Sequence, residues 1–582
     1  MTEPRPLRRP GRTPGSFNLG VALTVLVVLL PLLLNAATSA PPTAAEFSPN
    51  ARQVIKKAPP GQAAAVNGTG EGAAPGAGGT GNGASPTPSP SAQAQPTPTG
   101  SPVPETEIKK CVGPPPLRQI EDPQSPPCIA YYKGDNGGAT SRGVTRESVY
   151  IAVPTPENAQ AQYDALFAFF NKRFQFYGRK LVPEYCDATK SGASDQATQV
   201  SDAATSASGC GGTKPVPFAS TFYRQNNGAY YMPSMACTHK IIVVGSYSPY
   251  DSSFLNRCAG YQFQYPMMVD EEFANVGQWA CRRLAGKKAS YAAGNDSATP
   301  PGPLTAHTRK FGILLEPFTD DDPVARPASL NPMLAQLHAC GVDVPSQDAI
   351  VNPVMGEFDP STAQNALLQL KNDGVTSIIC MCNFFSFGTL ARAAESSAFQ
   401  PEWISSTFGL NDVDSSFTLS AAPADQLAHT MGVTFQPRII KPLENPYNVA
   451  LAEGDPSQTP DTASTGEAKL EVYRALLLIA SGIQMAGPHL TVESFRDGLR
   501  DTKFPNPITS THAGAVDMKA DGYSLTADGA EWYYGTTATG PFSDSAGHPG
   551  TVCYLNGGRR YRLGEWPTGD APFFSSTCDS GA

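Results

Sequence analysis

The sequence lacks the short motifs that mark nucleotide-binding and nucleophilic enzyme sites. It has no P-loop, and no Gly-x-Gly-x-x-Gly segment follows a stretch with strand character. Ser220 has no Gly-x-Ser-x-Gly surroundings, so it lacks the context of a catalytic nucleophile. The seven histidines are scattered and do not show the spacing of metal ligands. We therefore expect a protein that is not an enzyme, with no catalytic residue, cofactor or metal ion.

Basic tracts are also missing. The formal net charge is −9, and residues 1–40 contribute +3 through four arginines and one glutamate, so the remainder is near −12. An acidic body without a basic patch argues against nucleic acid as a partner and against electrostatic binding to a membrane surface. Any membrane contact is therefore expected only through the N-terminal segment.

Residues 1–40 have the features of an export signal. Arginines precede an apolar run over residues 21–34, and small residues follow up to Ala40. The run is shorter than the roughly 20 residues of a spanning helix, and Pro31 interrupts it. We expect a signal peptide cut after Ala40, with a retained signal anchor as the alternative. The first cysteine is Cys111, which disfavours a lipid-anchored N-terminus.

Residues 41–106 contain almost no aromatic side chain after Phe47 and consist mainly of Pro, Gly, Ala, Ser and Thr. Such a composition cannot bury a core, so we expect a disordered linker. Fully extended, it would reach on the order of 200 Å. A linker of this kind carries a folded domain away from a membrane or through a cell wall.

All twelve cysteines lie beyond residue 110, which is typical of an exported chain with disulfides. Cys380 and Cys382 flank one residue of an apolar run, so their side chains share a face of the expected strand. No second pair has matching spacing, and structural zinc requires four ligands, so a structural role is favoured over a metal site. Connectivity does not follow from sequence, but the short-range candidates are Cys111 with Cys128, Cys186 with Cys210, Cys237 with Cys258, and Cys553 with Cys578.

The stretch from residue 356 to 412 predicts the fold class. Asp359 is a good helix N-cap, Pro360 fits the first helical position, and Gly374 is placed to end that helix. The apolar run 375–382 is too short for a helix and predicts a buried strand. A second helix from Leu390 and another strand follow. This α-β-α-β order is the repeating unit of an open parallel sheet.

Strands and helices also alternate earlier in the sequence, before residue 356. Long helices follow at about 467–499, and the tail over 513–574 is rich in strands and hairpins. We therefore expect an α/β fold with two Rossmann-like lobes, each with a parallel sheet, joined by a multi-strand hinge. The expected segments are 107–308 and 429–509 for lobe 1, and 309–428 and 510–578 for lobe 2.

In the order of its segments the chain resembles the type I periplasmic solute-binding proteins, the group that includes branched-chain amino acid and amide binders of ABC importers. The resemblance covers roughly residues 140–575. It departs from the family pattern at a long insertion, 292–308, and at Ser220–Arg224, where a glycine-rich stretch is replaced. The segments that carry it are 143–151, 171–184, 358–379, 391–403 and 473–487.

The resemblance implies a ligand held between two lobes, with hydroxyls from lobe 1 and aromatic and amide groups from lobe 2. Tyr247 and Phe318 are equally consistent with a role in capping the core, and Asn383 with fixing a turn. A partner for a ligand ammonium would be Asp320, Asp321, Asp322 or Asp412. The expected ligand-binding residues are Ser220, Thr221, Tyr223, Ser246, Tyr247, Phe318, Thr319, Asn383, Phe384 and Phe408.

The function implied is capture of a small solute outside the cytoplasm for an ABC-type permease. The alternative is a membrane-tethered envelope sensor or scaffold that keeps the fold without transport. Either protein would lie on the outer face of the cytoplasmic membrane or in the cell wall, and would be secreted if the signal is cut.

Overall fold

The computed structural model describes residues 111–580 apart from short internal stretches. The export segment and linker predicted for residues 1–106 lie outside the described residues. So do the predicted site residues Ser246, Tyr247, Phe318 and Thr319, and the candidates Asp320 to Asp322. Within the described part, no helix is both long enough and apolar enough to cross a membrane. The internal stretches left out are 155–158, 187–194, 224–227, 246–248, 318–329, 354–355, 410, 413–421, 439, 461–466, 506–517, 519–521, 541–548 and 575–576.

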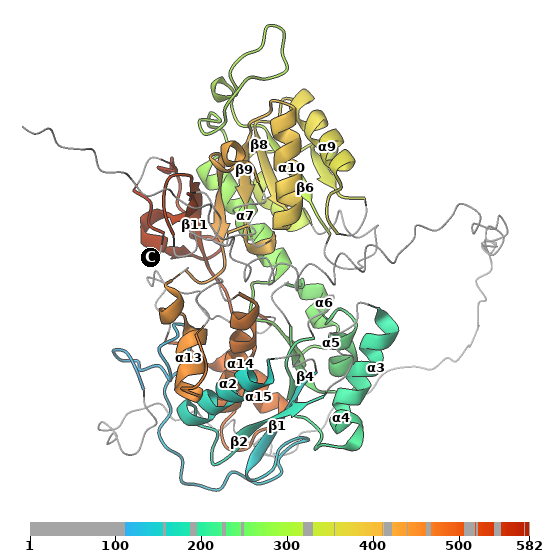
Figure 1. Ribbon diagram of the computed structural model, residues 1–582, viewed down its shortest axis with the longest axis vertical. Helices are drawn as coiled ribbons and strands as arrows, with labels where there is room; N and C mark the ends of the chain where they lie inside the picture. The colour runs from blue at the N-terminus through green and yellow to red at the C-terminus, as the bar shows by residue number, and fades with distance from the viewer. Residues whose placement is uncertain are drawn as a thin grey trace, which may run out of the picture. The chain divides into compact units, whose positions relative to one another are not determined.

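The first sheet is fully parallel, with the order β2-β1-β3-β4-β5 (Figure 1). Its strands are rich in β-branched residues, and Val149 and Ile151 of the central strand are completely buried. The strands are β1 (Ser148–Val153), β2 (Lys180–Tyr185), β3 (Ala219–Ser220), β4 (Ile242–Val244) and β5 (Gln262–Phe263).

Helices cover both faces of this sheet. Figure 1 shows α2 and α14 on one side and α3 to α5 on the other. One hydrophobic cluster unites the sheet with helices from both early and late parts of the chain, including Phe170 and Leu477. We call this unit lobe 1. Its helices are α2 (Gln160–Arg173), α3 (Gln196–Ala207), α4 (Gly209–Gly212), α5 (Tyr231–Pro233), α6 (Ser252–Asn256), α13 (Pro446–Gly454), α14 (Glu467–Met485) and α15 (Val492–Asp501).

The second sheet has the order β12-β11-β10-β9-β8-β6-β7, with β13 paired to β11. Strands β6 to β10 run parallel, whereas β11 is antiparallel to both β10 and β12. Its strands are β6 (Phe311–Leu315), β7 (Ala349–Val351), β8 (Ser377–Met381), β9 (Glu402–Ser405), β10 (Thr430–Thr434), β11 (Gly529–Gly535), β12 (Thr551–Tyr554) and β13 (Arg560–Tyr561).

Alternate residues of each central strand serve two separate cores. Ile378 and Cys380 pack with α9 (Pro360–Asn372) and α10 (Phe384–Ser396), whereas Ile379 and Met381 pack with α7 (Val269–Arg283) and α8 (Asn331–His338). This period of two follows from the pleat of a strand buried on both faces. We call this three-layer unit lobe 2. A short helix, α12 (Ala424–Leu427), precedes β10.

Among the described residues the chain passes between the lobes at three places: 264–268, 435–438 with 440–445, and 524–528. Both lobes belong to one compact unit, Pro98–Ala582. The lobe boundaries therefore differ from the predicted ones. Helix α7 buries Phe273 and Trp279 in the core of lobe 2, so lobe 1 ends near residue 267 rather than 308. Strand β10 belongs to the second sheet, although it was expected in lobe 1. Conversely, Leu525 packs in lobe 1.

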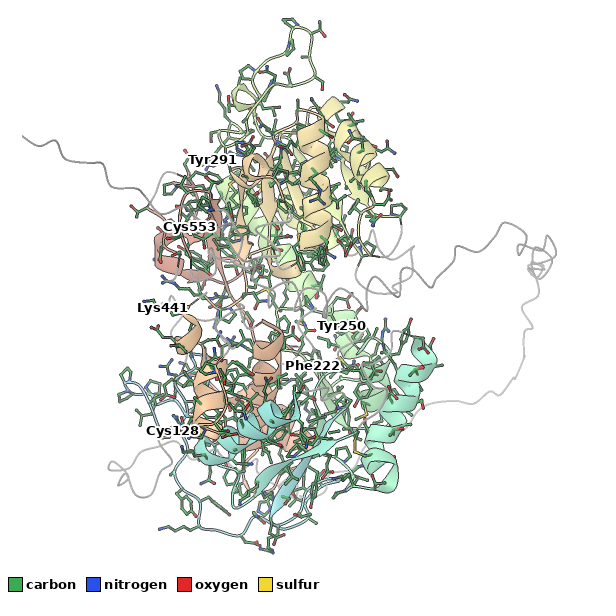
Figure 2. The ribbon with its side chains drawn as sticks, in the orientation of Figure 1. Cys128, Phe222, Tyr250, Tyr291, Lys441 and Cys553 are labelled. Atoms are coloured by element: carbon green, nitrogen blue, oxygen red, sulfur yellow. A yellow bond between two sulfur atoms is a disulfide. The ribbon has the colours of Figure 1, made fainter. Side chains whose placement is uncertain are left out.

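All twelve cysteines are paired in six disulfides. Four bonds join the same partners that short-range spacing suggested, including Cys553 with Cys578 (Figure 2). Cys281 with Cys340 and Cys380 with Cys382 complete the set. The last bond links side chains on one face of β8 and the residue after it, so these cysteines are structural.

Candidate functional site

The carboxyl edge of the lobe 1 sheet carries the hydroxyls predicted to hold a ligand. Ser220 Oγ lies 2.9 Å from the hydroxyl of Tyr231, and Tyr223 donates its hydroxyl to Asp202 over 2.7 Å. The rings of Tyr223 and Tyr231 stack with centroids 4.9 Å apart. Thr221 bonds the carbonyl of Ala152 through its backbone N–H.

These three predicted residues are fully buried, and their hydroxyls bind other groups of lobe 1. Their hydrogen bonds fix the turn after β3 against helices α3 and α5. The neighbouring aromatic residues at this edge are Phe222 and Tyr250, which Figure 2 labels. Even these are mostly buried, and Tyr250 stacks on Phe254 with centroids 3.9 Å apart.

Asn383, at the carboxyl end of β8, is the N-cap of α10. Its side-chain oxygen accepts from the N–H of Ser386 at 2.8 Å, which satisfies one of the free donors at the start of the helix. Its amide nitrogen donates to Glu316 over 2.8 Å, and its backbone N–H donates to the same carboxylate at 3.1 Å. Burial raises the pKa of Glu316, which follows β6, and Glu357 adds to this shift. Both polar ends of Asn383 thus fix a turn.

The aromatic groups at this edge divide into exposed and buried ones. Phe385 is 47% exposed, and its ring lies 4.2 Å from that of Phe384. Phe408, in contrast, is buried against Phe273 of α7, with centroids 5.1 Å apart. The next residue, Gly409, lies close against the backbone after β8, where a Cβ would collide with the carbonyl oxygen of Cys382. The exposed aromatic surface therefore lies at the start of α10.

Two buried acids, Glu272 and Asp412, lie next to the segment that carries Phe408. Glu272 of α7 accepts from Ser406 Oγ and from the backbone N–H of Phe408, both over 2.6 Å. Burial raises the pKa of Glu272 to about 8 despite these donors, and the nearby Asp412 adds to the shift. Asp412 accepts from Thr407 over 2.6 Å, and burial raises its pKa also. Asp412 is thus enclosed within lobe 2 and is not placed to meet a ligand ammonium.

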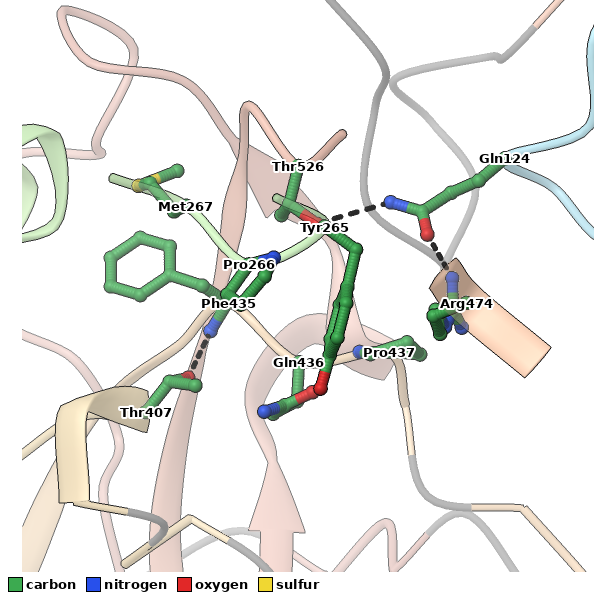
Figure 3. Close-up of a pocket in the computed structure, with 10 residues that line it drawn as sticks. All are labelled: Gln124, Tyr265, Pro266, Met267, Thr407, Phe435, Gln436, Pro437, Arg474 and Thr526. Atoms are coloured by element: carbon green, nitrogen blue, oxygen red, sulfur yellow. Dashed lines mark hydrogen bonds between the residues drawn. The ribbon is translucent and has the colours of Figure 1, made fainter. Parts of the chain in front are cut away.

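A pocket lies where the three crossings meet (Figure 3). Its free space is only about 10 Å³, roughly what one water molecule requires. Arg474 of α14 reaches it, and the guanidinium Nε makes no hydrogen bond. The pocket borders Thr407 at the end of β9, next to the predicted Phe408. Its lining residues are Gln124, Tyr265, Pro266, Met267, Thr407, Phe435, Gln436, Pro437, Arg474 and Thr526.

The structure brings Asn383, Phe384 and Phe408 to one edge of lobe 2, and Ser220, Thr221 and Tyr223 to one edge of lobe 1. It shows no direct hydrogen bond between these two sets within the described residues. Sequence reasoning missed Glu272, Glu316 and the crossing pocket. A helix was predicted from Leu390, but α10 already begins at Phe384. The spacing Asn-x-x-Ser from Asn383 to Ser386 was the sequence signal for this earlier start. No group of three or more His, Cys, Asp or Glu suited to a metal occurs in the part of the chain described.

No protein-family model matches the sequence, and no curated protein matches it. Solved structures do resemble the chain. A possible leucine/isoleucine/valine-binding protein from Rhodopirellula baltica is 12% identical, with a TM-score of 0.45, covering 71% of this chain and 97% of its own. A leucine-binding protein from Thermotoga maritima is 11% identical, with a TM-score of 0.45 and coverage of 70% and 97%.

An ABC transporter solute-binding protein from R. palustris, in complex with 4-hydroxybenzoate, is 11% identical with a TM-score of 0.46. It covers 74% of this chain and 100% of its own.

Proposed function

We propose that the chain is an extracytoplasmic solute-binding protein that captures a small molecule, such as an amino acid or amide, between its two lobes for an ABC-type importer. The observation that carries the proposal is the two-lobed design. Two separate sheets, the first parallel and the second parallel from β6 to β10, have their own cores, and three short crossings connect them. In open parallel sheets, ligands bind beyond the carboxyl ends of the strands. Movement about crossings of this kind closes such lobes on a ligand.

The rim chemistry favours a solute with both polar and apolar parts. The exposed ring of Phe385 and its neighbour Phe384 offer apolar cover at the start of α10. In this proposal Ser246, Tyr247 and Thr319 would supply polar contacts, and Phe318 would add apolar cover. Because the crossing pocket has space for only about one water, the solute would bind farther out between the lobes.

A permease on the outer face of the cytoplasmic membrane would be the partner, and the N-terminal segment would keep the lobes near it. An alternative is a tethered envelope sensor or scaffold. The insertion at residues 292–308 favours this second function, because a protein that delivers a solute to a permease does not require such an insertion. In it Asp296 accepts from Gly302 N and pairs with His307, both over 2.8 Å.

A thermal-shift screen against amino acids, amides, short peptides and sugars tests the proposal. A solute at about 100 times its dissociation constant should stabilise the fold by roughly 2.7 kcal/mol. Phe385→Ala should then weaken binding, because it removes the exposed ring. Leu368→Ala is the matched control, since Leu368 is similarly exposed but lies in the C-terminal half of α9, which leads to the opposite end of β8.

The outcomes separate the two functions. A solute whose stabilisation is lost in Phe385→Ala and kept in Leu368→Ala supports capture at the lobe 2 edge. A well-folded protein that no solute in the panel stabilises would contradict solute capture and favour the sensor or scaffold.

A further inference from the structure

The segment before β1, residues 111–132, is built into lobe 1. A disulfide between Cys111 and Cys128 closes it into a loop, and Cys128 is labelled in Figure 2. Within the loop, Ile120 joins the hydrophobic core of lobe 1, and Gln119 and Gln124 are both buried. We call this segment the lead-in.

Gln124 is the lead-in residue that reaches a crossing. Its amide nitrogen donates to Thr526 Oγ1 over 3.2 Å, and its amide oxygen accepts from Arg474 of α14 (Figure 3). A guanidinium can only donate, so the amide oxygen must face Arg474. The amide nitrogen must then face Thr526, whose hydroxyl oxygen can accept. Arg474 thereby fixes the orientation of the contact to Thr526.

Buried groups of lobe 1 hold this arrangement in place. Asp122 Oδ1 accepts from the backbone N–H of Gln124 over 2.8 Å. Its other oxygen accepts from the hydroxyl of Tyr473 at 3.1 Å and lies 3.9 Å from the Arg474 guanidinium. Hydrogen bonds to charged groups are stronger than neutral ones. The amide oxygen of Gln124 is therefore anchored to lobe 1 through Arg474, and its amide nitrogen holds Thr526.

Thr526 lies in the third crossing, between groups held by different lobes. On one side, Leu525 packs in the core of lobe 1 and donates its N–H to Gln264 of the first crossing over 3.0 Å. On the other side, Asp528 accepts from Arg560 of β13 over 2.7 Å, within lobe 2. Residues in such a position absorb the backbone rotation when lobes move. A side-chain bond to Thr526 thus restrains the hinge itself.

We propose that Gln124 is a positioning residue of the hinge, which holds the third crossing against lobe 1 and so sets the resting separation of the lobes. The consequence for solute affinity rests on the proposed function, whereas the restraint on the crossing does not. If the restraint favours one lobe arrangement, its loss shifts the population of the binding-competent state. One hydrogen bond corresponds to about a two- to tenfold change in dissociation constant.

The experiment is hydrogen–deuterium exchange of the purified full-length protein, read at residues 523–528. Gln124→Ala and Thr526→Val should each speed exchange there, and the double variant should be no faster than either single variant. Thr526→Ser keeps the accepting hydroxyl and should restore slow exchange. Gln119→Ala is the matched control, because the Gln119 side chain is also buried and hydrogen-bonds, among the described residues, to Arg173 and Ile129 of lobe 1.

A general loss of stability would not reproduce this pattern. Unchanged exchange at 523–528 in Gln124→Ala, or an equal increase in Gln119→Ala, would overturn the proposal. Where the thermal-shift screen yields a solute, its dissociation constant should change in Gln124→Ala and not in Gln119→Ala. If no solute binds, the exchange result still decides the role of Gln124, so failure of the proposed function is distinguishable from failure of this inference.

Discussion

The carboxyl group of Glu272 lies 2.6 Å from the hydroxyl oxygen of Ser406, although 134 residues separate them in sequence. Glu272 belongs to the first turn of α7, immediately after the first crossing, and Ser406 follows β9. The contact therefore joins α7, the first element of lobe 2 in the chain, to the edge of the sheet where Phe408 lies. An ionised carboxylate at this buried site is unfavourable, so its protonation should affect lobe 2 stability.

We predict that lobe 2 loses stability as the pH rises from about 5 to 9. Burial raises the pKa of Glu272 to about 8, so the folded protein binds a proton that the unfolded chain releases at lower pH. Stability is then greatest below the unfolded pKa and falls through the folded one, by at most about 1.4 kcal/mol per pH unit for one proton. Denaturant unfolding across this range measures the slope.

Glu272→Gln should flatten that slope, because the amide stays neutral while its oxygen still accepts. The raised pKa of Asp412 has the same sign, so some slope should remain. The exposed Glu147→Gln serves as control and should keep the wild-type slope. An unchanged slope in Glu272→Gln would show that this carboxyl does not bind the proton in the folded state.

Two disulfides of lobe 2 should differ strongly in their contribution to the free energy of unfolding. Cys281 and Cys340 close a loop of 59 residues, whereas Cys380 and Cys382 are two residues apart. In the chain-entropy account, removing the first bond costs about 4 kcal/mol and removing the second less than about 2 kcal/mol. Double Cys→Ala variants of each pair, unfolded in denaturant, measure both values. Equal losses would contradict an entropic origin.

Asn383 should act mainly through structure. Asn383→Ala removes the cap of α10 and one donor to Glu316, so it should destabilise lobe 2 by about 1–2 kcal/mol. Asn383→Ser keeps a capping oxygen and should recover part of the loss. Asn383→Asp also caps, but places a second acid beside Glu316 and should recover less. Loss of solute binding in Asn383→Ala without any loss of stability would instead assign Asn383 to direct ligand contact.

The predicted lobe 1 hydroxyls should likewise prove structural. Tyr223→Phe removes a buried donor to Asp202 and should cost about 1–3 kcal/mol of unfolding free energy. Tyr185→Phe is the control, because its 2.7 Å bond to Asp164 is exposed and should contribute at most about 1 kcal/mol. Thermal unfolding of both variants provides the comparison, and equal effects would count against a special role for the buried network.

Local signals in the sequence predicted much of the architecture. Asp359 caps α9 and Pro360 begins it, as expected from propensities that depend on a few neighbouring residues. The apolar run 375–382 was predicted to be a buried strand, and β8 spans Ser377–Met381 within it. Assignment of α7 to a lobe did not follow, because its burial depends on strands that come tens to hundreds of residues later.

The candidate site was less predictable for the same reason. Residue type and position at strand ends identified Tyr223 and Asn383, but not that internal partners already occupy their polar atoms. The hydrogen-bond partners of the Glu272 and Gln124 side chains lie more than 130 residues away in sequence. Only the folded chain brings these pairs together, and sequence spacing carries no trace of them.

The most direct test of the two-lobed capture account is small-angle X-ray scattering of the purified protein, with and without the solute that gives the largest thermal shift. Closure about the three crossings predicts a smaller radius of gyration when the solute is saturating. A radius that does not change on saturation would contradict lobe closure as the way this protein holds a ligand.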